Sequence, residues 1–116
     1  MKYMLIFGNT TEGSEEWANA PAEVKAQGYA KITDWFAKNG SKIVHTDQLQ
    51  PPSTATTVRH DNGSTIVTDG PFIEAKETIA GYAVVDVDDL DGALELARTW
   101  PASEAVEVRP VVPREG

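Results

Sequence analysis

Two apolar runs, at residues 2–8 and 79–87, constrain the fold of this chain more than any other feature. The first combines Tyr, Leu, Ile and Phe without a polar break. The second is the most strand-like run of the sequence and places on one face Ile79, Gly81, Ala83, Val85 and Val87. Runs of this kind are typical of central strands with side chains buried on both faces. We therefore expect both runs to lie at the centre of one sheet.

Two stretches have the periodicity of helices. Pro21 suits the first turn of a helix, and apolar residues then recur at helical spacing until Asn39-Gly40 supplies a stop. Further on, Asp88 or Asp89 can cap a second helix that ends at Trp100-Pro101. The polar residues 9–20 include Gly and Ser, which favours a loop.

The remaining segments are extended. Residues 41–50 predict a strand, and Pro51-Pro52 then predicts a stiff link. Residues 55–60 and 64–68 flank Asp61-Asn62-Gly63, and Asn-Gly suits the positive φ angles of a hairpin turn. Residues 105–112 form the last predicted strand.

This order of elements is β-α-β-hairpin-β-α-β within one domain, residues 1–116. It predicts an α+β fold of the ferredoxin-like type, with an antiparallel sheet, two helices on one face and an inserted β-hairpin. The other face of such a sheet is left open. Apolar residues fall on both faces of the two central strands, so we expect a second copy to cover it in a homodimer.

Charge and composition narrow the possible partners. The 116 residues carry a net charge of -8 and no cysteine. Without a concentration of Lys and Arg, neither nucleic acid nor an anionic membrane is an expected partner. The apolar start of the chain is too short for a signal peptide or a membrane span, so we expect a soluble, cytoplasmic protein. The sequence has no metal-binding or nucleotide-binding motif, and we expect no metal and no cofactor.

The leading candidate site is the connection between the strands 64–68 and 79–87. It contains a Gly-Pro turn signal and a concentration of ionisable groups, in Asp69, Phe72, Glu74, Lys76 and Glu77. Clustered carboxylates beside one lysine can provide a general base, or bind a cation or an amine. Alternatively, Asp69 caps the turn and Lys76 pairs with a carboxylate. Phe72 either anchors the loop in the core or on a partner, or stacks on a ligand.

Three further residues are candidates. Glu107 and Arg109 project from one face of the last strand, and Arg109 either clamps a ligand carboxylate or pairs with Glu77 or Asp69. His45 can act as a general acid or base, or can simply face solvent or an interface.

The stretch Asp69-Gly70-Pro71-Phe72 with Glu74, Lys76 and Glu77 resembles the signature of the DGPF-domain proteins, a branch of the YCII-related family. The likeness extends to Met1–Leu5, Leu49–Pro52, Thr68, Gly81-Tyr82 and Glu107–Pro110. It implies a ferredoxin-like fold that dimerises sheet to sheet into an α+β barrel. It also implies relatives that act on ring lactones or chlorinated hydroxyquinones through a His–Asp pair. In those enzymes the first helix supplies the histidine, but residues 21–39 contain none here.

Two functional hypotheses follow from these residues and this resemblance. The first is a homodimer with a cleft near Asp69–Glu77 that binds a small organic molecule, with acid–base chemistry. The second is a non-catalytic regulatory or interaction module, because the resemblance also implies a link to sigma factors of the stress response.

Overall fold

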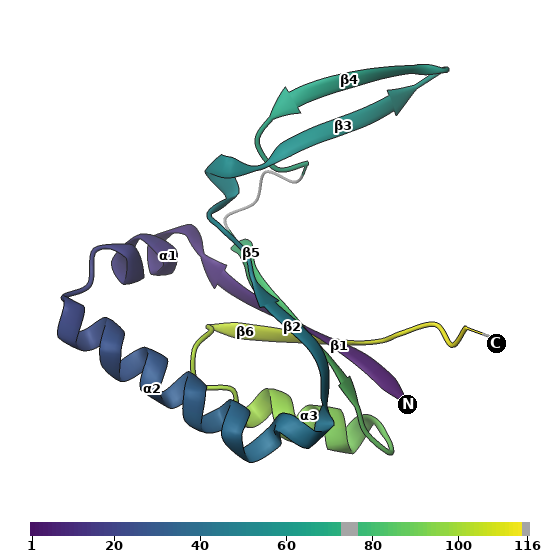
Figure 1. Cartoon of the computed structure of the whole chain (residues 1–116). Coiled ribbons are helices and arrows are strands. Elements are labelled where there is room, and N and C mark those ends of the chain that lie inside the picture. Colours follow the sequence, from purple (N-terminus) through teal and green to yellow (C-terminus); the bar gives the residue numbers. More distant parts are fainter. Residues whose placement is uncertain (73–76, 115–116) are drawn as a thin grey trace.

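A computed structural model describes residues 1–72 and 77–114 (Figure 1). The elements are β1 (Lys2–Thr10), α1 (Thr11–Ala18), α2 (Ala22–Asn39), β2 (Ile43–Gln48), β3 (Thr56–Asp61), β4 (Ser64–Asp69), β5 (Glu77–Asp86), α3 (Leu90–Thr99) and β6 (Ala105–Pro110). Short 3-10 turns, η1 (Gly40–Lys42) and η2 (Pro52–Thr54), flank β2.

The main sheet has four strands in the order β2-β5-β1-β6, and every neighbouring pair is antiparallel. The two apolar runs are the central strands β1 and β5, as their sequence predicts. The α2 and α3 helices lie on one face of this sheet (Figure 1). The arrangement is the predicted α+β fold, and the elements follow in the predicted order except for one additional helix, α1.

The core lies between the two helices and one face of the sheet. Its buried side chains are Tyr3, Leu5, Phe7, Trp35, Ala83, Val85, Ala93 and Leu96. Trp100 extends this core, because its ring stacks on Phe7 with centroids 4.0 Å apart. The indole N–H of Trp35 donates to Thr99 Oγ1 at 3.0 Å and so connects α2 to α3.

The prediction of a loop over residues 9–20 is wrong. β1 continues to Thr10, and α1 occupies Thr11–Ala18. The helix begins there because Thr10 Oγ1 accepts a hydrogen bond from the backbone N–H of Gly13 at 3.0 Å, as an N-cap residue does. Trp17 on α1 packs edge-on against Tyr29 of α2, with centroids 5.5 Å apart.

The β3–β4 hairpin forms a separate two-stranded sheet that projects from the end of the main sheet and away from the helices (Figure 1). We call this hairpin, residues Thr56–Asp69, the arm. Its turn uses Asn62 at φ 45° and Gly63 at φ 85°, which confirms the predicted Asn-Gly hairpin. At the base of the arm, the backbone N–H of Gly70 donates to the carbonyl of Ala55 at 2.7 Å.

The last strand is shorter than predicted, since it ends at Pro110 and residues 111–114 continue without regular structure. Among the described residues, no helix combines the length and the apolar character that crossing a bilayer requires.

Candidate functional site

Strand register brings His45, Glu107 and Arg109 onto the face of the sheet that no described helix covers. In an antiparallel sheet, directly paired residues point to the same face. Leu5 pairs with Ala83 and Val108 on the helix side, so the residues before and after each of them point to the other side. We call this other side the open face.

Two rows of side chains cross the open face from β2 to β6. The His45 row consists of His45, Val84, Met4 and Arg109. The Asp47 row lies beside it and consists of Asp47, Tyr82, Ile6 and Glu107. Each row therefore has a polar side chain at both ends and two mostly apolar side chains between them.

At the β2 margin, His45 and Asp47 form a pair. They are two residues apart in one strand, so their side chains share a face. His45 Nε2 lies 3.0 Å from Asp47 Oδ2, and the imidazole ring lies 5.7 Å from the ring of Tyr82. Within residues 1–72 and 77–114, the polar contact of the His45 side chain is made through Nε2, so Nδ1 is not engaged by Asp47. An imidazole beside a carboxylate is an arrangement that can transfer a proton, with the carboxylate orienting the ring.

At the β6 margin, Arg109 Nη2 lies 2.5 Å from Glu107 Oε2. The two residues project from the same face, as their spacing predicts. In the structure Arg109 thus pairs within its own strand instead of with Glu77 or Asp69. Its side chain is 69% exposed, so guanidinium donors remain accessible to an anionic oxygen.

The floor between the two margins is formed by Met4, Ile6, Tyr82 and Val84, all half-buried in the single chain. Strands lie about 4.8 Å apart, so β2 and β6 are separated by roughly 14 Å. This distance is larger than the width of a single six-membered ring. The open face therefore combines an apolar floor with the His45–Asp47 pair at one margin and the Arg109 guanidinium at the other.

The two ends of the Asp69–Glu77 connection lie in different sheets. Asp69 ends β4 at the base of the arm, paired with Thr56, and does not belong to the main sheet. Glu77 begins β5 and pairs with Thr10 at the end of the main sheet. Phe72 is 67% exposed, and its carbonyl accepts a hydrogen bond from Arg59 Nη2 at 2.9 Å. The predictions for Glu74 and Lys76 lie outside the described residues.

Sequence reasoning singled out His45 and Arg109 but missed that one face brings them together with Asp47, Tyr82 and the apolar floor. The His-x-Asp spacing in an extended segment was the available signal for the first pair. Register across four strands was not available, because it depends on how segments distant in the chain pair.

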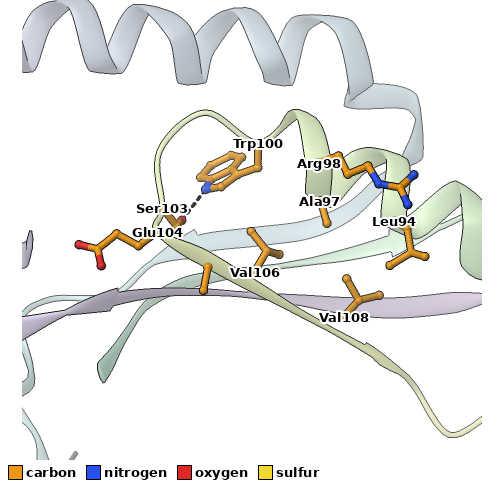
Figure 2. A pocket seen from close by; sticks show the side chains of 9 residues that line it. Leu94, Ala97, Arg98, Trp100, Ser103, Glu104, Val106 and Val108 are labelled. Carbon is orange, nitrogen blue, oxygen red and sulfur yellow. Dashed lines mark hydrogen bonds between the residues drawn. The ribbon is translucent and has the colours of Figure 1, made fainter. Parts of the chain in front are cut away.

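Two shallow hollows lie on the helix side of the sheet. The first, of about 390 Å³, is bordered by α3 and β6 (Figure 2). Trp100 lies at its end, where the indole N–H donates to Ser103 Oγ at 2.6 Å. The second lies between α2 and α3 around Trp35 and Thr99. Neither is lined by any of the predicted site residues.

Residues 1–115 match the YCII-related domain. The chain belongs to the YCII-related family. Within it, an uncharacterised protein of Rhizobium meliloti (strain 1021) is 32% identical over 115 residues, which cover 96% of this chain and 92% of that protein.

A solved structure shares the fold of this YCII-related protein. It is the 5-chloro-2-hydroxyhydroquinone dehydrochlorinase of Burkholderia phenoliruptrix, in complex with 2,5-dihydroxybenzoquinone. The two structures superpose with a TM-score of 0.53 over 97% of this chain and 94% of the other, at 10% sequence identity. The likeness supports the ferredoxin-like α+β fold.

Proposed function

We propose that this YCII-related protein binds a small, ring-shaped organic molecule on the open face of its sheet and performs acid–base chemistry on it. The observation that carries this proposal is the pair of rows, which combine an apolar floor with His45–Asp47 at one margin and Arg109 at the other. Ligand sites typically combine a mainly apolar lining with a few placed polar groups.

In this proposal each margin has its own task. His45 transfers a proton to or from a hydroxyl group or a ring carbon, and Asp47 orients the imidazole. Arg109 holds an anionic oxygen on the far side of the ring. The side chains of Met4, Ile6 and Val84 contact the face of the ring.

The ligand class is supported by the fold neighbour, whose complex contains 2,5-dihydroxybenzoquinone. This compound is a flat ring with oxygens on opposite sides, which suits a floor with polar groups at two margins. At 10% identity the neighbour's reaction does not transfer to this chain. The compound is nevertheless a rational first probe.

We further propose that the protein is a cytoplasmic homodimer in which the open faces of two copies meet. The half-buried Met4, Ile6, Tyr82 and Val84 would then line a space between two sheets, where excluded water strengthens polar contacts. A chain without cysteine is compatible with the reducing cytoplasm.

The test uses 2,5-dihydroxybenzoquinone with the wild type, His45→Gln and Arg109→Gln. We expect the wild type to bind it in isothermal titration calorimetry and to accelerate deuterium exchange at its ring carbons, followed by NMR. Because a positioned general base contributes about 10²- to 10⁴-fold, His45→Gln should lose an acceleration of that order while still binding. Arg109→Gln should weaken binding about tenfold or more.

Arg98→Gln is the matched control, because Arg98 is an equally exposed arginine that pairs with Glu95 on α3, away from the open face. It should bind the probe like the wild type. Equal binding and equal exchange in all four proteins would contradict the proposal.

A second candidate function is a regulatory or interaction module, such as one that contacts a sigma factor. Its support is Phe72, whose ring is presented to solvent and not to the core. In this case Phe72→Ala should abolish co-purification with the sigma factor and leave probe binding unchanged. A titration that detects no complex at micromolar concentration would count against this alternative.

A further inference from the structure

The arm leaves large apolar side chains exposed. Val58 and Val67 pair across its two strands and are 52% and 63% exposed, and Ile66 on the other face is 49% exposed. An isolated two-stranded hairpin is at best marginally stable in water and needs a third strand or a packed face. Packing among residues 1–72 and 77–114 does not explain why this hairpin holds its shape.

The surface area of the chain points to a large missing contact. The chain exposes 8587 Å², whereas a compact monomer of 12.6 kDa exposes about 6,200 Å². Its radius of gyration is 16.3 Å, compared with about 13 Å for a compact domain of this length. The excess of roughly 2,400 Å² matches the share that one subunit buries in an obligate homodimer.

The open face alone is too small for this excess. Four strands at a spacing of about 4.8 Å, each with about six residues along its length at roughly 3.4 Å per residue, cover roughly 400 Å² in plane. Side chains make the accessible area of a sheet face larger than its planar area. Even if the value is doubled for this reason, most of the excess exposed surface remains unexplained. The arm is the projecting element with paired apolar side chains on its surface, and it extends on the side away from the helices (Figure 1).

We infer that the arm of one copy packs on a second copy of this chain and closes the end of the second copy's open face. The Val58–Val67 pair provides the apolar contact. The site on each sheet is then incomplete without the arm of the other subunit. The closing of a ligand site rests on the proposed function, whereas the contact between arm and partner does not.

The experiment places a paramagnetic label on the arm of one chain and observes its effect on the backbone amides of the other chain. It needs no ligand. Because the chain has no cysteine, Thr68→Cys can carry a single nitroxide on the arm, on the face opposite Val67. The spin-labelled variant, at natural isotope abundance, is mixed with ¹⁵N-enriched wild type. The wild type has no cysteine and therefore carries no spin label. Paramagnetic broadening in the enriched chain then reports only contacts between subunits. We expect broadening of the amides of Met4, Ile6, Tyr82 and Val84.

The matched control places the same nitroxide at Glu23→Cys, an exposed position in the first turn of α2 on the helix side. It should leave those four amides sharp. Absence of broadening from Thr68→Cys would overturn the inference. So would broadening confined to the helices, because the arm would then contact the partner away from its open face.

A second measurement tests the apolar contact. Val58→Thr with Val67→Thr keeps the β-branched shape of the strands but adds hydroxyl groups, and should raise the dimer dissociation constant about tenfold or more. Val112→Thr, the same change at a residue that is 81% exposed in the C-terminal segment, should have no such effect. Equal dissociation constants in sedimentation would overturn the inference even if a ligand binds. Failure of the benzoquinone probe with the arm contact intact would overturn only the proposed function.

Discussion

At the scale of the residue, His45 and Asp47 share a face of β2 because strand side chains alternate. The position of His45 and Asp47 beside Tyr82 also depends on Gly81, which pairs with Gln48. A Cβ atom at Gly81 would lie 2.9 Å from the backbone oxygen of Asp47 and 3.4 Å from Gln48 Cα. The absence of a side chain at Gly81 thus lets β2 approach β5 closely enough to form the site.

Gly81→Ala should therefore push β2 away from β5. We expect a loss of about 1–3 kcal/mol in the free energy of unfolding, because both close neighbours are backbone atoms. Urea denaturation measures this loss, and amide chemical shifts of residues 45–48 should move with it. Gly40→Ala is the control, since a Cβ there meets nothing within 4 Å and its φ is helical. Equal stabilities of the two variants would contradict this role of Gly81.

At the scale of the element, capping side chains decide where the helices begin. Asp89 begins α3, because its Oδ1 accepts a hydrogen bond from the backbone N–H of Gly92 at 2.9 Å. Sequence reasoning left Asp88 and Asp89 as alternatives for this position. Thr10 plays the same part for α1, where Gly13 and Ser14 had favoured a loop. In α1, one N-cap hydrogen bond therefore goes together with a helix although Gly13 and Ser14 have low helix propensity.

Asp89→Ala should lower the free energy of unfolding by about 1 kcal/mol, as the loss of an N-cap does. Asp88→Ala removes the neighbouring carboxylate, which is also exposed, and should change stability by less than about 0.5 kcal/mol. Thermal unfolding followed by circular dichroism compares the two variants. A greater loss in Asp88→Ala would mean that the cap is assigned to the wrong residue.

At the scale of the whole molecule, the single chain is a thin slab with a projecting arm. Its extents are 47 × 47 × 19 Å, and its core is confined to the layer between α2, α3 and one face of the sheet. The other face carries the candidate site, and the arm carries the exposed Val58–Val67 pair. We therefore expect the stable form of the protein to be an assembly of two such slabs.

A dimer of this kind makes thermal stability depend on concentration, because mass action favours the associated, folded state. The melting temperature should rise steadily as the protein concentration rises from about 1 to 100 μM, and light scattering should give twice the chain mass of 12.6 kDa at the upper end. A melting temperature that is constant over this range, together with a monomer mass, would contradict the homodimer.

The sequence by itself determined the order of the elements, the central position of residues 2–8 and 79–87, and the Asn62-Gly63 turn, because periodicity and turn chemistry are local properties. It also singled out His45 and Arg109 from the chemistry of their side chains. Only the tertiary structure decided that these two lie at opposite ends of one row, with Val84 and Met4 between them. That arrangement depends on the pairing of four strands distant in the chain, and a shift of one residue in any pairing would send a side chain to the other face.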